Sequence, residues 1–202
     1  MPRLSIAVPQ AGQAVALAEL FRPAVDDVWM EIGFGTGEHL LAQAQQHPKV
    51  GFIGCEPYLN GVAAMLSGLA DARLDNVRFF ADDARRLLPA LPSGSIGRLF
   101  ILFPDPWPKS RHHGRRLINV DTIGYFARIL REGGELRVAS DHGGYVRWVL
   151  EHLTRDRSFC WSARRADDWR QRPEDAPPTR YEEKAMARGQ PCMHLSFRRT
   201  SR

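Results

Sequence analysis

The feature that most constrains the fold is a series of short apolar runs separated by longer stretches with helical periodicity. The runs cover residues 28–34, 50–57, 77–82, 97–104 and 134–140. Most are apolar without alternation, which is typical of strands buried on both faces of a parallel sheet. The intervening stretches place apolar residues three and four positions apart, which predicts helices over 37–47, 59–70, 84–91, 118–130 and 144–154. We therefore predict an α/β fold: a doubly wound, Rossmann-like, mostly parallel sheet with helices on both faces.

The length and composition suit one domain of this kind. The 202 residues are 44% hydrophobic, enough for a packed core. We expect a single domain over residues 1–202, with a basic substrate-binding loop around 155–184 and a closing strand over 191–199. No apolar run approaches the ~20 residues that span a bilayer, and no signal peptide is evident. Three scattered cysteines indicate reduced thiols in a cytoplasmic protein. Nothing indicates a partner subunit, so a monomer is expected.

Charge is distributed unevenly along the chain. Residues 1–154 contain 16 Lys/Arg and 16 Asp/Glu, whereas residues 155–202 contain 12 and 7, so the C-terminal segment carries the whole net charge of +5. Such a segment either attracts a polyanion by counterion release or forms a solvated basic face. Charge alone does not decide between the two interpretations.

A glycine-rich turn, EIGFGTGEH, joins the first predicted strand to the first helix. Gly33, Gly35 and Gly37 permit a tight turn and leave room for a ligand against bare backbone. The dinucleotide fingerprint GxGxxG is absent because position 38 is Glu. The turn alone is weak evidence for a nucleotide site.

Acids at successive strand ends make the ligand more specific. Glu56 ends the second strand, where a carboxylate can accept both hydroxyls of a ribose. Asp82 or Asp83 ends the third, within reach of an adenine amino group, and we favour Asp83 because it leads directly into the next helix. Glu31 would repel a pyrophosphate but suits a ligand with sulfonium and ammonium groups. Each acid alone fits an ordinary strand end, but together they predict an S-adenosylmethionine site.

The stretch FPDPWPKSRHHGRR, residues 103–116, follows the fourth predicted strand. Ligands of parallel sheets bind outside the carboxyl ends of the strands, so Asp105 is expected beside the cofactor, stiffened by a proline on each side. Trp107 either stacks on a flipped base or packs under the turn. The histidines lack the company of other metal ligands, so we expect no metal.

Taken together, these stretches resemble the bacterial tRNA (guanine-N7)-methyltransferases of the TrmB type. The matching stretches are EIGFGTGEHL, GCEPYLNGV, the acid pair before ARRLL, FPDPWPKSRHHGRR, SDHGGY and TRYEEK, between residues 31 and 184. The block PDPWPK-x-RH is the specific one. The resemblance implies a class I methyltransferase fold, S-adenosylmethionine as cofactor, tRNA as partner, and methylation of N7 of the variable-loop guanosine at position 46.

The resemblance also implies roles for individual residues. Asp105 is the implied active-site acid, and Glu31, Glu56 and Asp83 are the implied cofactor-binding acids beside Gly33, Gly35 and Gly37. Implied substrate contacts are Lys109, Asp141, Thr179, Arg180, Tyr181 and Glu182. The basic run offers phosphate contacts at Arg111, Arg115 and Arg116.

The residues agree with that chemistry but leave alternatives open. N7 of guanine carries a lone pair and no proton, so its attack requires alignment and charge stabilisation rather than a general base. A carboxylate at position 105 can bind the N1–H and N2–H₂ edge or offset the developing positive charge. One alternative is an exocyclic-amine nucleic-acid methyltransferase, since Asp-Pro-Pro-aromatic blocks serve that reaction. A nicotinamide-dependent oxidoreductase and a non-catalytic RNA-binding protein are further alternatives; the missing GxGxxG and Glu31 argue against the former.

Overall fold

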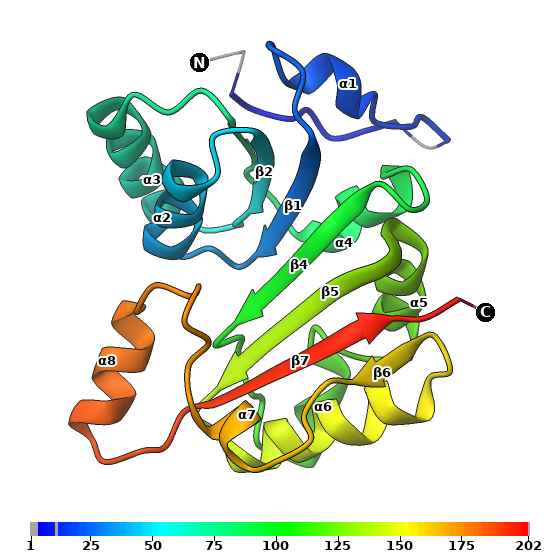
Figure 1. The fold of residues 1–202 in the computed structure, drawn as a ribbon, viewed down its shortest axis with the longest axis vertical. Coiled ribbons are helices and arrows are strands. Elements are labelled where there is room, and N and C mark those ends of the chain that lie inside the picture. Colours follow the sequence, from blue (N-terminus) through cyan, green and yellow to red (C-terminus); the bar gives the residue numbers. More distant parts are fainter. Residues whose placement is uncertain (1–3, 11, 202) are drawn as a thin grey trace.

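A computed structural model describes residues 4–10 and 12–201. Within these residues a seven-stranded sheet has the order β3-β2-β1-β4-β5-β7-β6 (Figure 1). Five strands run parallel to one another: β1 (Asp27–Ile32), β2 (Val50–Cys55), β3 (Val77–Phe80), β4 (Ile96–Leu102) and β5 (Leu130–Ser140). Two antiparallel strands, β7 (Met193–Arg199) and β6 (Phe159–Trp161), complete one edge. The predicted mostly parallel, Rossmann-like sheet is confirmed.

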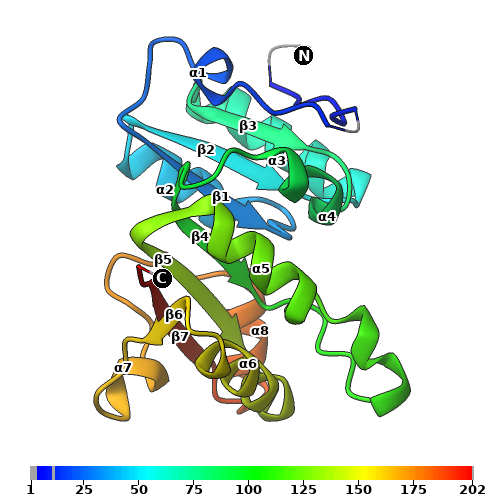
Figure 2. The same ribbon diagram turned by 90° about the vertical axis from the view of Figure 1, so that its right-hand side faces the viewer.

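Helices cover both faces of the sheet (Figure 2). On one face, α2 (Glu38–Gln46) and α3 (Leu59–Ala72) pack on an apolar cluster that includes Trp29, Phe52 and Phe100. On the other, α4 (Ala84–Leu87), η1 (Leu88–Ala90), α5 (Val120–Ile129) and α6 (Gly143–Arg155) pack on a larger cluster around Met30 and Phe126. The short α1 (Leu17–Leu20) lies at the edge of the latter cluster. Successive β1 side chains alternate between the two cores, as a strand requires.

The sheet changes direction of winding between β1 and β4. From β1 the chain moves outward through β2 to β3, then returns to place β4 on the other side of β1. Ligands of open α/β sheets bind at such a switch point, outside the carboxyl ends of the strands. The fold therefore directs attention to the loops after β1, β2 and β4.

The expectation of one long loop over residues 155–184 is wrong. That segment contains β6, α7 (Asp167–Arg170) and the beginning of α8 (Arg180–Ala187). The helices are short and polar, so they lack the apolar period that a sequence pattern requires. Residues 171–179, which we call the strap, connect α7 to α8.

The strap is fastened to the sheet by Asp175. Its carboxylate accepts hydrogen bonds from Arg137 Nη1 at 2.7 Å and from Arg98 Nη1 at 2.9 Å. Its carbonyl oxygen accepts one from Gln43 Nε2 at 2.6 Å. The strap is thus tied to β4, β5 and α2, and this fixes where α8 begins.

Asp175→Asn is expected to loosen the strap in a pH-dependent manner. The hydrogen bonds from Arg137 are the largest cause that lowers the pKa of Asp175, followed by the charge of Arg137 and then by the hydrogen bond and charge of Arg98. Together they lower this pKa to about 2, from an ordinary value of about 3.9. A depressed folded-state pKa stabilises the fold above the ordinary pKa, and this stabilisation is lost as pH falls from about 4 to 2. Amide exchange in α8 should therefore be faster in the variant at pH 7, and the two proteins should converge near pH 2.

The same change at exposed Asp71 is the matched control for this experiment. Asp71→Asn should leave exchange in α8 unchanged. Equal protection of α8 in Asp175→Asn and the unmodified chain at pH 7 would contradict the fastening role.

Candidate active site

An open cleft of about 800 Å³ lies where the switch point predicts, outside the carboxyl ends of β1, β2 and β4. Its volume suits a ligand of nucleotide size. The cleft brings together eight of the residues predicted from sequence: Gly33, Gly35, Glu56, Asp83, Asp105, Arg115, Arg180 and Tyr181. The other predicted residues lie outside its lining: Glu31, Gly37, Lys109, Arg111, Arg116, Asp141, Thr179 and Glu182.

The glycine turn after β1 requires its glycines. Gly33, Gly35 and Gly37 have φ angles of +78°, +56° and +87°, a region that side chains with a Cβ rarely adopt. Gly37 lies outside the cleft lining and caps the start of α2. At Gly33 and Gly35 the turn therefore presents bare backbone to the cleft, beside Thr36.

Glu56 holds this turn in place. The residue is 5% exposed, and each of its carboxylate oxygens accepts one backbone hydrogen bond: Oε2 from Gly35 N at 2.9 Å and Oε1 from Tyr58 N at 3.0 Å. Glu56 lines the cleft, and its oxygens keep unused lone pairs, since an ionised carboxylate has about four acceptor sites. A fixed, charged acceptor of this kind can bind a pair of vicinal hydroxyls.

Helix α3 also supports the turn, through the close approach of Gly61. A Cβ at this position would lie 2.3 Å from the carbonyl oxygen of Gly35 and 3.2 Å from Cγ of Glu56. Backbone cannot yield as a flexible side chain does. The absence of a side chain at Gly61 therefore sets the distance between α3 and the turn.

Gly61→Ala is accordingly expected to weaken binding of an adenosyl ligand about tenfold. Overpacking typically costs about 1–3 kcal/mol, and displacement of the turn transfers part of this cost to binding, where about 1.4 kcal/mol is tenfold in Kd. Calorimetric titration with S-adenosylmethionine measures the change. The control is Gly124→Ala, at an exposed helical position with nothing within 4 Å of the added methyl. An unchanged Kd in Gly61→Ala would show that the turn adjusts freely.

Asp83, rather than Asp82, lines the cleft. Asp83 caps α4, accepting Arg85 N at 2.9 Å, and also pairs with the Arg85 guanidinium. The side-chain hydrogen bond from Arg85 lowers the pKa of Asp83, so the group is a carboxylate at neutral pH. Asp82 is instead paired with Arg86. Of the two acids, Asp83 is the one in a position to contact a ligand in the cleft.

Glu31 lies beneath the turn rather than in the cleft. Its side chain is buried, and its Oε2 is 2.7 Å from His39 Nδ1 on α2. The pleat of β1 points Glu31 to the same face as Trp29, toward α2. In this structure the Glu31 carboxylate is paired with His39, and its contact with a cofactor stays a prediction.

The loop after β4 carries Asp105 into the cleft between two residues with positive φ. Phe103 has φ +50° and Trp107 has φ +40°. Asp105 is exposed to the cleft. Trp107 also lines the cleft and is covered by the Arg115 guanidinium, 4.9 Å from the ring centroid. Its ring is half-buried, so it serves both as support and as cleft wall.

The structure places Arg116, which the sequence offers as a phosphate contact, inside the protein. Its side chain is only 3% exposed, with Nε donating to Pro106 O at 2.9 Å and Nη2 to Trp107 O at 3.2 Å. Nearby aromatic rings turn this cation inward. Arg115, next to it, is exposed and lines the cleft. Lys109 is exposed directly before the 3₁₀ helix η2 (Ser110–Arg115), and Arg111 is exposed within it.

Helix α8 contributes to two different cavities. Thr179 caps the helix by accepting Glu182 N at 3.2 Å. Tyr181 is 62% exposed, lines the cleft and stacks on Phe103 with 6.4 Å between ring centroids. Arg180 reaches Glu38 at 3.0 Å, which ties α8 to the end of the glycine turn.

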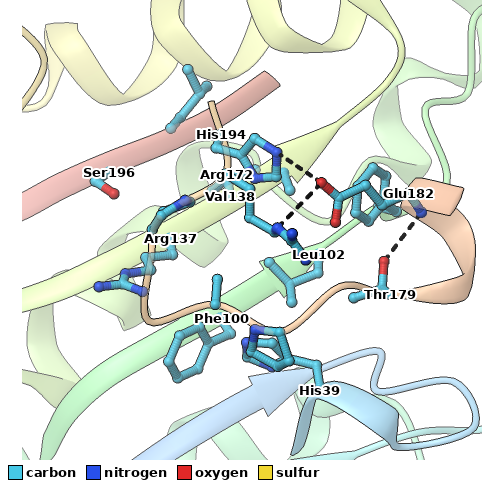
Figure 3. A pocket seen from close by; sticks show the side chains of 16 residues that line it. His39, Phe100, Leu102, Arg137, Val138, Arg172, Thr179, Glu182, His194 and Ser196 are labelled. Carbon is cyan, nitrogen blue, oxygen red and sulfur yellow. Dashed lines mark hydrogen bonds and ion pairs between the residues drawn. The ribbon is translucent and has the colours of Figure 1, made fainter. Parts of the chain in front are cut away.

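Glu182 faces the second cavity, between the strap and the sheet (Figure 3). Its carboxylate lies 3.7 Å from Arg172 and 3.6 Å from His194. Burial, followed by the charge of Arg172, lowers the pKa of His194 to about 4, so this imidazole is neutral at pH 7. The cavity has space of about 30 Å³, which holds roughly two water molecules and no purine.

Sequence reasoning missed several residues of the cleft. Tyr58, Lys184 and Arg85 line it together with the predicted groups. Tyr58 directly follows Glu56-Pro57, and Lys184 is four residues after Arg180 and so on the same helical face. These spacings are the features of the sequence from which Tyr58 and Lys184 could have been predicted to lie near the cleft. Asp141, half-buried after β5, lies outside the cleft.

Residues 4–10 and 12–201 contain neither a candidate metal cluster nor a candidate membrane span. No three His, Cys, Asp or Glu side chains of this part of the chain are grouped so as to hold a metal ion. No helix in it is both long and apolar enough to cross a membrane.

Comparison with known proteins gives one consistent picture. A family described as "putative methyltransferase" matches residues 26–195. The tRNA (guanine-N(7)-)-methyltransferase of Rhodospirillum rubrum is 50% identical over 204 residues, covering 100% of this chain and 80% of the relative. The enzyme of the same name from Paramagnetospirillum magneticum is 48% identical, covering 98% and 84%.

Solved structures agree in fold. The 16S rRNA methyltransferase KamB superimposes with a TM-score of 0.67 at 19% identity, covering 94% of this chain and 95% of that one. An rRNA methylase from Streptococcus thermophilus gives a TM-score of 0.60 at 13% identity, covering 88% and 89%. At these identities the likeness concerns the fold alone.

Proposed function

Since this chain belongs to the tRNA (guanine-N(7)-)-methyltransferases, as a relative half identical over its whole length shows, we infer that it transfers a methyl group from S-adenosylmethionine to N7 of a guanosine in tRNA. Within the chain, the observation that carries this function is the cleft at the switch point. It brings together Glu56 and Asp83, which we assign to the nucleoside of the cofactor, and the loop acid Asp105. We propose the variable-loop guanosine at position 46 as the target.

The cleft fits the cofactor by the chemistry of its donors and acceptors. Glu56 presents two fixed carboxylate oxygens for the ribose hydroxyls. Asp83 is ionised and lies where it can accept from the adenine amino group. When bound, S-adenosylmethionine supplies an electrophilic methyl group on a sulfonium. The residues that would hold it thus come from the ends of β2 and β3 and from the backbone of the glycine turn.

Asp105 is proposed to orient the guanine and to stabilise its positive charge. The N7 lone pair forms the new bond without prior loss of a proton, so no general base is required. A carboxylate placed beside the purine accepts from its N1–H and N2–H₂ edge and offsets the cation that develops on methylation. Tyr181 and Trp107, which both line the cleft, offer aromatic surface for a base removed from its stack.

Exposed cations around the cleft are proposed to bind the RNA backbone. Arg115 and Arg180 line it together with Lys184, and Lys109 and Arg111 are exposed on the adjoining loop. Such cations position a polyanion without reading its sequence. Direct contacts of Lys109, Asp141, Thr179 and Glu182 with the substrate, and of Glu31 with the cofactor, remain part of the proposal. We also propose that the protein acts in the cytoplasm, as a monomer and without a metal ion.

Nucleoside mass spectrometry tests the function. Unmodified tRNA transcript is incubated with the purified chain and S-adenosylmethionine, digested, and analysed for 7-methylguanosine. A matched transcript with adenosine at position 46 tests the site. Appearance of 7-methylguanosine in the first transcript only is expected. Product in both would move the target to another guanosine, and a product methylated on an exocyclic amine would favour that alternative class.

A further inference from the structure

The loop that carries Asp105 is held in a conformation that its own residues disfavour. Phe103, with φ +50°, and Trp107, with φ +40°, lie on either side of Asp105 and both have a Cβ. Each such residue costs roughly 1–3 kcal/mol and persists only where the surrounding structure imposes it. Other parts of the molecule must therefore fix this loop.

Arg116 makes the contacts that fix the far side of the loop. Its Nε donates to Pro106 O at 2.9 Å and its Nη2 to Trp107 O at 3.2 Å. These carbonyls belong to the two residues that directly follow Asp105. A guanidinium is a rigid, planar fork, so two parallel bonds fix the orientation of the peptide units they reach.

The guanidinium is itself held by α6. Its central carbon lies 4.6 Å from the ring centroid of Trp148 and 5.6 Å from that of Tyr145. Tyr145 is fully buried in the core. Trp148 donates through Nε1 to Ile118 O at 2.7 Å and stacks on His152 with 3.9 Å between centroids. The contacts thus run from the core through Arg116 to the loop.

The groups that contact the Arg116 guanidinium are uncharged. Within the described part of the chain, its partners are carbonyl groups and aromatic rings, with no ion pair to a carboxylate. Burial of the group lowers its pKa, and a buried cation is costly unless its donors are satisfied. The neighbouring Arg115 is exposed, on the cleft side of Trp107. Two adjacent arginines thus face opposite ways.

From these contacts we propose that Arg116 is a positioning residue, which orients Asp105 for methyl transfer by holding the Pro106 and Trp107 carbonyls, and is not a contact to RNA. The proposal rests on the proposed function, since it assigns a role within that reaction. It distinguishes Arg116 from Arg115, whose guanidinium is free to meet a phosphate.

Single-turnover methylation at saturating tRNA and S-adenosylmethionine tests the proposal with the variants Arg116→Gln, Arg116→Lys and Arg115→Gln. Misplacement of a reacting group by about 1 Å costs on the order of 10²-fold in rate. We expect Arg116→Gln to lower the rate roughly 10- to 100-fold with little change in the KM for tRNA. Arg116→Lys, which keeps the charge but loses the fork, should be intermediate. Arg115→Gln should instead raise KM and reduce the salt slope of binding by about one.

A second readout separates positioning from folding. Amide hydrogen exchange of residues 105–110 should be faster in Arg116→Gln than in Arg115→Gln, while the core strands of both stay protected. A wild-type single-turnover rate in Arg116→Gln combined with a reduced salt slope would overturn the proposal in favour of a phosphate contact. A rate loss matched by the unfolded fraction at assay temperature would overturn it in favour of a purely structural role. If Arg116→Gln does not fold, a wild-type rate in Arg116→Lys overturns it.

These measurements distinguish a failure of the proposed function from a failure of the role proposed for Arg116. Absence of 7-methylguanosine with the unmodified chain would count against the proposed function, whereas the exchange measurement would still report whether Arg116 holds the loop. A methylating wild-type chain and an equally fast Arg116→Gln variant would count against the further inference alone.

Discussion

Asp105→Ala is expected to lower the single-turnover rate of methyl transfer by about 10²- to 10³-fold, the usual cost of removing one preorganised charge-stabilising group. The Kd for S-adenosylmethionine should stay within about threefold. The two quantities should respond separately because different residues are proposed to bind the cofactor and to orient the guanine. Glu56 and Asp83 lie at the ends of β2 and β3, whereas Asp105 is presented by the separate loop after β4.

Asp105→Asn refines this prediction. Asparagine keeps the shape and one acceptor oxygen but removes the charge and turns one acceptor into a donor. If the carboxylate offsets the positive charge on the purine, the asparagine variant should be nearly as slow as the alanine variant. If a single accepted hydrogen bond suffices, it should retain much of the rate.

A matched control and a contrary outcome complete the test. Asp71→Ala removes an exposed aspartate from α3 and should leave the rate unchanged. A large increase in cofactor Kd in Asp105→Ala, with the rate restored at high cofactor concentration, would mean that Asp105 is a cofactor ligand. In that case the chemical role would have to pass to another group of the cleft.

The sequence predicts the fold well wherever a local pattern and the tertiary environment agree. Continuously apolar runs correspond to β1 to β5 because these strands are covered by helices on both faces. Predicted ends differ by a few residues, and β5 begins at Leu130, four residues before the predicted start. β6 and α7 were missed because three and four residues carry no detectable period.

The site is predictable in part for the same reason. Glycines with positive φ and acids at strand ends leave local signals, and Gly33, Gly35, Glu56 and Asp83 do line the cleft. The direction in which a side chain points leaves no such signal in the sequence. Arg115 and Arg116 are identical residues in adjacent positions, and Arg116 alone of the two packs against Tyr145 and Trp148, which lie far along the chain. A pattern of residue types cannot contain that information.

The direction in which the Glu31 side chain points is a second property that the sequence leaves open. Its proximity to the glycines suggests a contact with the ligand, but alternation along β1 aims its carboxylate at His39. Parity along a strand is readable from sequence only when the two faces differ in polarity. Here both faces are apolar cores, so the pattern gave no basis for choosing a face.

Glu56→Gln is expected to raise the Kd for S-adenosylmethionine by about 10²- to 10³-fold, since hydrogen bonds to a charged group are worth about 1.5–3 kcal/mol and more than one is lost. Both carboxylate oxygens accept from backbone amides, Gly35 N on one side and Tyr58 N on the other. A glutamine has only one acceptor oxygen. Whichever way its amide is turned, its NH₂ group faces one of the two backbone N–H donors.

The variant therefore loses a ribose acceptor and also pushes apart the segments that Glu56 joins, the glycine turn and the start of α3. Calorimetric titration measures the change, with Glu151→Gln on the exposed face of α6 as the matched control. Excess cofactor should restore the single-turnover rate of Glu56→Gln, whereas no cofactor concentration should restore that of Asp105→Ala. If Glu56→Gln instead binds the cofactor normally and reacts slowly, the assignment of these two acids must be exchanged, because the cleft offers both carboxylates to the same ligands.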